Sequence, residues 1–388
     1  MTRARDLANL GSQAGSGLDA SDITTGTFPD TVTLKSSPLS HRNLWINGAM
    51  MVSQRYGTSA GTGTHPYFGL DRYKVHYSGG PVISSQQVTD VPASPLDSFV
   101  NSMKMTITTN DATSGTDQCY VKYPMEGIDT AQLRFGSTGA KTTTLSFYVK
   151  SSVAGIYSIS YKNEAGNRSY TKKYTITSAD TWERIELTIP GDTTGTWLKG
   201  TPDIGLAITF NLGSGSSREQ AEGSWGTGNV DGASGSTGSD TWVNTSGATF
   251  FITGIQLEEG SSATPFESRS YADELIRCQR YTVKFGGVTA YDYLGVGGYN
   301  TAGMKTHVTL PQMMRAVPIV ESTGTVGHWT ASSDYAGYTI TAISKAGSVH
   351  DYNHITLDMA FSGGSNGAQY HAWGNNNASA KIIIAAEL

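Results

Sequence analysis

The stretch Ile255-Gln-Leu-Glu-Glu-Gly-Ser-Ser-Ala-Thr-Pro-Phe-Glu-Ser-Arg-Ser-Tyr271, continued by Ala-Asp-Glu-Leu-Ile-Arg-Cys-Gln-Arg-Tyr281, decides the fold. Its first residues alternate between apolar and polar, which predicts a strand with one buried face. The Gly-Ser-Ser run and Pro265 end that strand in a turn. Ser270 is a suitable N-cap, and the apolar residues after it have helical spacing. The segment predicts a strand that leads into a short helix, as in any sandwich domain followed by a linker helix.

Composition narrows the class of protein. Charged residues make up 15% of the 388, against roughly 25% in an average soluble domain. Glycine reaches 46, and Ser and Thr are abundant, which is typical of β-rich extracellular or virion proteins. The net charge is -5 with no basic run, so we expect no nucleic-acid binding. No apolar run approaches the roughly 18 residues of a membrane helix, so no membrane insertion is expected. The N-terminus lacks the apolar region of a secretory signal, which favours assembly in a cytoplasm.

Residues 43–266 carry short alternating segments spaced about ten residues apart, which predicts an all-β sandwich. Asn47-Gly48, within Asn43–Tyr56, is a hairpin signal between two strands. The long Gly/Ser-rich stretch 212–241 interrupts the strands, and we expect Trp225 to pack it down rather than bind a ligand. Asp71 and Arg72 are expected to form a buried ion pair rather than a reactive one. Further strands are predicted at Val82–Val88, Ser102–Thr108, Gln118–Pro124, Thr143–Lys150, Ile156–Lys162, Lys172–Thr177, Trp182–Ile189, Gly205–Phe210 and Thr249–Leu257.

Residues 282–388 form a third β-rich region. Its last segment, Ile382–Leu388, is so apolar that it must pair with something, and a trimer core would cover it. Strands are predicted at Tyr281–Phe285, Tyr291–Val296, Met304–Leu310, Ile319–Glu321, Tyr338–Ile343, His354–Ala360 and Ala380–Glu387.

Residues 1–40 hold too few apolar side chains to bury a core in a single chain. Arg3, Arg5, Leu7 and Leu10 fall in a segment that could form two helical turns. Three copies wound together could bury their apolar stripes against one another, which favours a homotrimer. A disordered tail is the alternative.

Several segments resemble those of bacteriophage tail-fibre and receptor-binding proteins. The Q-L-E-x-G-x-x-A-T-P-F-E exit at 256–267 and the C-Q-R-Y that follows it are similar to the end of their jelly-roll domain. Asn43-Leu-Trp-Ile-Asn-Gly resembles its opening, and Asp22-Ile-Thr-Thr-Gly-Thr-Phe28 resembles shaft and attachment segments. Leu310-Pro-Gln-Met-Met-Arg-Ala-Val-Pro-Ile-Val320 resembles the start of their tips.

This resemblance implies a virion protein of the phage tail or a surface appendage. The expected organisation is an extended anchor at 1–40, a jelly-roll body at 43–266, a linker helix at 267–281 and a sandwich-like tip at 282–388. The anchor, with Arg3, Arg5, Leu7 and Leu10, would join tail or baseplate proteins. The homotrimer would bind a host glycan or protein through the tip.

Aromatic side chains in the tip are the candidate receptor contacts. They lie among Gly, Ser, Asn and His, a mixture typical of recognition loops, and Gly363–Asn377 is the best candidate loop. The alternative is that about half of these aromatic side chains are trimer core. The predicted receptor-binding residues are Trp329, Tyr335, Tyr352, Tyr370, His371 and Trp373.

We find no catalytic motif, no cofactor motif and no cysteine pair at zinc spacing, and we expect a binding protein rather than an enzyme. His350 and His354 would share a metal only on a helix, whereas their surroundings predict a turn entering a strand, so no metal is expected. Two alternatives remain open: a glycan-degrading tailspike enzyme, and a structural capsid or baseplate ornament that binds no receptor.

Overall fold

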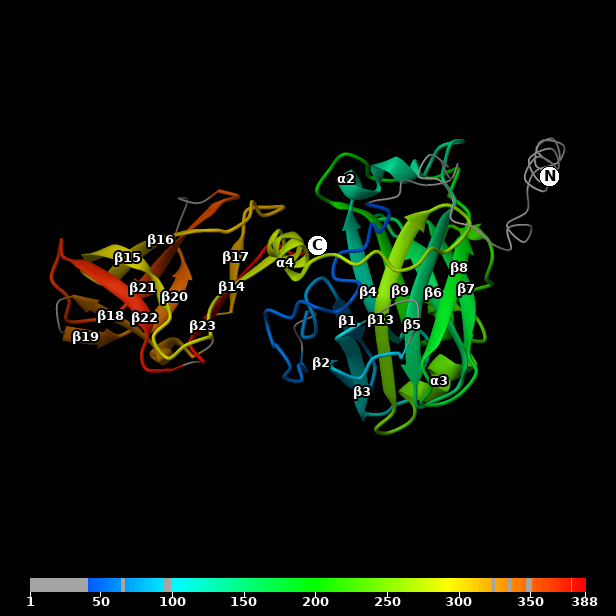
Figure 1. Cartoon of the computed structure of the whole chain (residues 1–388), viewed down its shortest axis with the longest axis horizontal. Helices are drawn as coiled ribbons and strands as arrows, with labels where there is room; N and C mark the ends of the chain where they lie inside the picture. Colours follow the sequence, from blue (N-terminus) through cyan, green and yellow to red (C-terminus); the bar gives the residue numbers. More distant parts are fainter. Residues whose placement is uncertain are drawn as a thin grey trace, which may run out of the picture. The chain divides into compact units, whose positions relative to one another are not determined.

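The chain is built mostly from β-strands, with few and short helices (Figure 1). The computed structural model describes residues 41–63, 67–93, 99–322, 325–333, 336–346, 351–377 and 379–388. They all belong to one compact unit, Pro38–Leu388. The predicted anchor at 1–40 lies outside the described residues and stays a prediction.

Two antiparallel sheets form a β-sandwich in the first part of this unit (Figure 1), which confirms the predicted fold class. The chain crosses between the sheets after β1, β3, β4, β5, β7 and β8, and again between β11 and β13, so neighbours in sequence often belong to opposite sheets. The six-stranded sheet contains, in spatial order, β1 (Lys74–Tyr77), β4 (Gln118–Glu126), β9 (Ile204–Ser214), β6 (Gly155–Lys162), β7 (Ser169–Ile176) and β11 (Trp225–Gly226). The five-stranded sheet contains β2 (Val82–Val88), β3 (Ser102–Thr109), β13 (Thr249–Glu259), β5 (Thr143–Ser151) and β8 (Glu183–Ile189).

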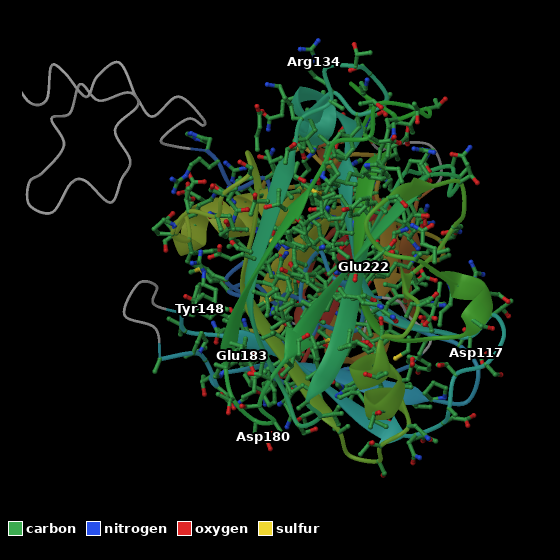
Figure 2. The ribbon with its side chains drawn as sticks, turned by 90° about the vertical axis from the view of Figure 1, so that its right-hand side faces the viewer. Asp117, Arg134, Tyr148, Asp180, Glu183 and Glu222 are labelled. Carbon is green, nitrogen blue, oxygen red and sulfur yellow. The ribbon has the colours of Figure 1, made fainter. Side chains whose placement is uncertain are left out.

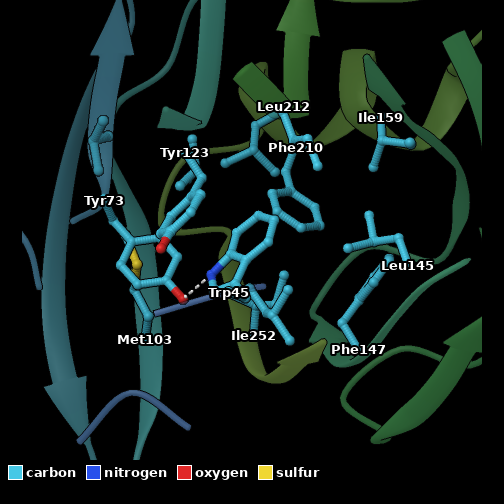
Figure 3. Packing of buried hydrophobic residues seen from close by; sticks show 14 of the residues in the cluster. Trp45, Tyr73, Met103, Tyr123, Leu145, Phe147, Ile159, Phe210, Leu212 and Ile252 are labelled. Carbon is cyan, nitrogen blue, oxygen red and sulfur yellow. Dashed lines mark hydrogen bonds between the residues drawn. The ribbon is translucent and has the colours of Figure 1, made fainter. Parts of the chain in front are cut away.

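The inner faces of the two sheets meet in an aromatic core (Figure 3). The Trp45 indole stacks on the ring of Tyr123, with the centroids 3.9 Å apart, and donates a hydrogen bond of 2.8 Å to the Tyr73 hydroxyl. Phe147 of the five-stranded sheet meets Phe210 of the six-stranded sheet edge to face at 5.2 Å. Charged side chains such as Arg134 and Asp180 project away from this core at the turns (Figure 2).

The predicted hairpin at Asn43–Tyr56 is wrong, because no strand forms there. Asn47 adopts a φ of 61° and is fully buried. Its amide group donates to the carbonyl oxygens of Val52 and Asp71 and accepts from the Val52 N–H, so a side chain replaces the ladder hydrogen bonds. Gly48 is needed for another reason: a Cβ there would collide with the carbonyl of Ile255.

The Gly/Ser-rich stretch is more ordered than predicted. It lies over the outer face of the six-stranded sheet, where the N–H of Ala233 donates to the Ser158 hydroxyl, which lies on that face. Trp225 packs against Phe135, Trp197 and Tyr170 at centroid distances of 5.3–5.7 Å, in agreement with its predicted packing role. The stretch contains η3 (Ser216–Arg218), β10 (Glu219–Gln220), β12 (Gly232–Ala233) and α3 (Thr237–Val243). Two further short helices, α2 (Gly127–Thr130) and η2 (Ala131–Leu133), follow β4.

The predicted exit from the sandwich is present. The strand β13 ends at Glu259, and the helix α4 spans Tyr271–Gln279, with the Ser270 hydroxyl accepting a hydrogen bond from the Asp273 N–H. Cys278 of this helix and Cys119 of β4 are both buried free thiols. Among the described residues, no helix is long and apolar enough to cross a membrane.

Two sheets and a second hydrophobic core follow α4. Three strands form one sheet in the order β14 (Thr282–Gly286), β23 (Lys381–Ala385) and β17 (Ile319–Ser322). The other sheet has the order β19 (Ala336–Thr339), β18 (Trp329–Ser333), β22 (Gln369–Gly374), β15 (Tyr293–Asn300), β16 (Gly303–Thr309), β21 (His354–Ala360) and β20 (Ala342–Lys345). A short helix, η4 (Val326–His328), precedes β18.

Three expectations for this region are corrected. The apolar strand β23 is paired on both edges, by β14 and β17, so its burial does not require a trimer. The candidate loop 363–377 contains β22, which lies between β18 and β15. The single strand predicted at 338–343 is two strands, β19 and β20, at opposite edges of the seven-stranded sheet.

Buried charges join the sandwich to the strands that follow α4. Arg55 makes ion pairs with Glu321 at 2.6 Å and with Glu387 at 3.0 Å, and Arg72 lies 3.4 Å from Glu387. Asp71 does not pair with Arg72 as predicted; it accepts hydrogen bonds from the main-chain N–H and side-chain amide of Gln54. Both residues are nevertheless buried, so their expected structural role is retained.

We predict that Glu387→Gln lowers the free energy of unfolding by about 3–5 kcal/mol at pH 7, because two buried guanidinium groups lose a countercharge. Burial alone would raise the pKa of this carboxyl, but Arg55, Arg72 and a Thr282 hydrogen bond hold it below its usual value. Its stabilising effect is therefore present above the unfolded-state pKa and lost as pH falls through the folded-state value.

Urea unfolding at pH 7 and at pH values below 4 measures this difference. The gap between the native protein and Glu387→Gln should shrink in acid, and the exposed Glu164→Gln should change stability by no more than about 0.5 kcal/mol. A gap that stays constant with pH would contradict the ion-pair account.

Candidate functional site

The outer face of the seven-stranded sheet carries the candidate site. Apolar and outward side chains alternate along its strands, so one face joins the core while the other is free. Cross-strand pairing places His371 of β22 between Val296 of β15 and Ser332 of β18. Lys305 of β16 likewise lies opposite Asp358 of β21, which lies opposite Ser344 of β20. These residues share one face that runs across six strands.

An aromatic cluster occupies one part of this face and consists of Tyr293, His371 and Trp373. Tyr293 is 60% exposed and lies opposite Trp373 across the β15–β22 pair. Its ring centroid is 6.0 Å from that of His371, and its hydroxyl is 3.4 Å from the His371 Nδ1 atom. Val296, 41% exposed, adds an apolar neighbour. Exposed aromatic rings of this kind stack on the apolar C–H faces of sugars or on flat apolar ligands.

A polar groove of about 340 Å³ lies on the same face beyond the aromatic cluster. Its polar side chains are Asn300, Lys305, Ser344 and Asp358, with Lys305 and Asp358 3.7 Å apart. An amide, an ammonium, a hydroxyl and a carboxylate together supply both donors and acceptors. The aromatic cluster and the polar groove lie toward opposite ends of β15 on one face, and together they offer stacking and hydroxyl recognition, a combination that suits an extended carbohydrate.

Only part of the predicted receptor-binding set lies here. His371 and Trp373 belong to the aromatic cluster, whereas Trp329 and Tyr370 point to the opposite face and are buried in the core. These two buried side chains cannot touch a ligand directly, so the sequence-based assignment is corrected for them. Tyr352 is 47% exposed but lies in the turn before β21, outside the strands of the cluster. Tyr335 lies outside the described residues.

Sequence reasoning missed Tyr293, Val296 and the four polar residues of the groove. Tyr293 and Val296 fall in a predicted strand, Tyr291–Val296, but alternation alone does not say which face is free. A β-bulge between Tyr293 and Gly295 shifts the register, so Tyr293 and Val296 both face outward although they are three residues apart. No signal in the sequence marks that bulge apart from the glycine at 295.

The described titratable groups that follow α4 do not assemble into a metal centre. Among the described residues, no three His, Cys, Asp or Glu side chains lie close enough to hold a metal ion. His354 pairs with Asp351 at 3.2 Å in an exposed turn. His350 lies outside the described residues.

No family model matches the chain, and no curated protein matches it in sequence. Among solved structures, part of the chain is similar to the enzymatically active domain of tailspike protein 4 from bacteriophage CBA120. The sequence identity is 14% and the TM-score 0.30, over 56% of this chain and 21% of that chain. The match thus spans about a fifth of the tailspike chain.

Two carbohydrate-binding modules are also similar in structure. One is the family 11 module from Clostridium thermocellum in complex with a β-1,3-1,4-mixed-linked tetrasaccharide, with 15% identity and a TM-score of 0.27 over 53% of this chain and 98% of that chain. The other is TmCBM61 in complex with β-1,4-galactotriose, with 9% identity and a TM-score of 0.28 over 56% and 99%. Similarities this low carry neither a ligand nor an activity over to this chain.

Because the two faces of β22 differ in burial, substitutions on them should differ in how much stability they cost. Tyr370→Ala should lower the free energy of unfolding by about 3–5 kcal/mol, because the ring is buried and its hydroxyl accepts a hydrogen bond from Ser365. Trp373→Ala, on the half-exposed side, should cost clearly less. Urea denaturation of both variants measures this, and equal losses would show that Trp373 is also a core residue.

Proposed function

We propose that this protein is a bacteriophage fibre component that binds a glycan on the host surface through the outer face of its seven-stranded sheet. The observation that carries the proposal is the pairing of the aromatic cluster with the polar groove on one continuous face. Sugar rings present both apolar C–H patches and hydroxyl groups, and this face offers a partner for each.

The residues of the groove favour binding over glycan cleavage. Glycoside hydrolysis uses two carboxyl groups, about 5–9.5 Å apart, on either side of the bond that is cut. Of the described residues that line the groove, Asp358 is the single carboxylate, and Lys305 lies 3.7 Å from it. A non-enzymatic role is therefore the simpler proposal, with a glycan-degrading tailspike as the alternative.

Virion attachment and trimer formation complete the proposal. Three copies, joined through the segment 1–40 and anchored to tail or baseplate proteins, would present three such faces on one fibre. Linked weak sites bind a repetitive surface far more tightly than one site does, because the second contact is intramolecular. The protein would assemble in the host cytoplasm and function on the virion.

We predict that Tyr293→Ala and Trp373→Ala each weaken binding of the full-length protein to bacterial surface polysaccharides by about tenfold. The reason is loss of an exposed aromatic platform at no large cost in stability. A glycan array followed by a direct titration of the best polysaccharide measures the effect. Tyr352→Ala is the matched control, since this aromatic residue is similarly exposed but outside the face, and it should bind normally.

The alternatives give different results in the same assays. Release of new reducing ends from the bound polysaccharide, abolished by Asp358→Asn, would favour the tailspike enzyme. Unchanged glycan binding in both Tyr293→Ala and Trp373→Ala would refute the proposed face. Absence of any glycan or cell binding by the native trimer would favour a structural ornament.

A further inference from the structure

Three lysines gather on the outer face of the six-stranded sheet, far in sequence from the tip. Lys74 of β1 and Lys122 of β4 lie directly opposite each other in the antiparallel pair. Lys162 of β6 is on the same face and lies opposite Ala207, two residues along β9 from the partner of Lys122. We call Lys74, Lys122 and Lys162 the lysine cluster. Like charges opposite each other destabilise a sheet unless something compensates them.

Among the residues that the structure describes, a carboxylate directly contacts one member of the lysine cluster, Lys162. The ammonium of Lys162 pairs with the buried carboxylate of Asp231, which also accepts a hydrogen bond from the Gln118 side chain. Each oxygen of the Asp231 carboxylate therefore already has a partner on the sheet beneath it. Among the described residues, the Lys122 ammonium makes neither a hydrogen bond nor an ion pair, although the side chain is half-buried. An unpaired, partly desolvated ammonium is unfavourable unless an anion joins it.

The remaining neighbours leave the region positively charged. Tyr120 forms the floor beside Lys122: its ring is 5.4 Å from the Lys162 ammonium and 5.1 Å from the His76 ring. Arg218, on the Gly/Ser-rich stretch, lies close enough to influence Tyr120, and the exposed Glu164 is the second carboxylate that acts on Lys122. The groups that act on Lys122 and Tyr120 are thus three further cations, Lys74, Lys162 and Arg218, and two carboxylates, Asp231 and Glu164, and His76 adds a charge when protonated.

We propose that the lysine cluster binds an oxyanion, a carboxylate or a phosphate, with Lys122 as the principal contact and Lys74 as the second. Such groups occur on acidic polysaccharides and on phosphorylated ones, and both present the same charge and acceptor geometry. The ligand would supply the missing countercharge between β1 and β4. This site is separate from the tip face and does not depend on it.

The pKa of the Lys122 ammonium is a quantity that anion binding should change and that can be measured. Burial, followed by repulsion from Lys162 and Lys74, lowers the pKa of Lys122 to about 8, while Glu164 and Asp231 oppose the shift. Burial and Lys74 also lower the pKa of His76. A bound oxyanion favours the protonated ammonium and must raise the pKa of Lys122. Binding should accordingly weaken as pH rises through the pKa of the free site.

The experiment is an NMR titration of the lysine side chains of the full-length protein with inorganic phosphate in one arm and glucuronate in the other. Sodium chloride at matched ionic strength controls for screening. We expect at least one of the two anions to raise the pKa of Lys122. The anion that binds more tightly shows whether the site prefers a phosphate or a carboxylate. Lys122→Gln should weaken binding by about tenfold, and Lys122→Arg, which keeps the charge, should retain it.

Two controls make the outcome decisive. Lys199→Gln removes an exposed lysine outside the cluster and should bind the anion normally. Tyr293→Ala should also bind it normally, so failure of the tip proposal is distinguishable from failure of this one. The inference is overturned if neither anion shifts the Lys122 resonance beyond the chloride control, or if Lys199→Gln weakens binding as much as Lys122→Gln.

Discussion

A single buried guanidinium, that of Arg72, holds together parts of the chain that are remote in sequence. It lies 3.4 Å from the centroid of the Tyr281 ring and 5.2 Å from that of Tyr123, and it donates a 2.6 Å hydrogen bond to the carbonyl of Pro124. Its countercharge, Glu387, comes from the residues that follow β23. A fully desolvated charge is tolerated only when such partners are all in place, so the sandwich, the end of α4 and β23 depend on one another.

The helix α4 and the residues that follow it are held in place by further buried polar contacts. Glu126, at the end of β4, accepts two hydrogen bonds of 2.7 Å from Arg280 and one of 2.5 Å from the Tyr281 hydroxyl. Glu274 of α4 in turn accepts from the main-chain N–H of Asn47. Polar contacts inside a low-dielectric region are strong but demand specific geometry, so they fix the position of α4 more sharply than apolar packing would.

The alternation of apolar and polar residues predicted most of the strands. The wrong predictions concern features that depend on contacts between residues far apart in the sequence. The strands at Val82–Val88 and His354–Ala360 were predicted with their observed limits, because the alternation and the flanking turns depend on residues that are adjacent in the sequence. Asn43–Tyr56 failed because the amide of Asn47 bonds to the main chain of Val52 and Asp71 in place of a partner strand. Trp329 and Tyr370 were assigned to the wrong side because the free face of a sheet is set by what packs on the other. The same limit hid the lysine cluster, whose members are 40 to 88 residues apart in sequence.

The location of the proposed receptor site on strands, rather than on loops, has a consequence for how the protein can diversify. Along β16, β22 and the part of β15 beyond its bulge, residues on the outer face alternate with residues that face the core. Every second position can therefore be exchanged while the neighbouring positions keep the hydrophobic packing intact. If the outer face binds a host glycan as proposed, single outward substitutions would change the glycan that is recognised while the core packing of the scaffold is kept.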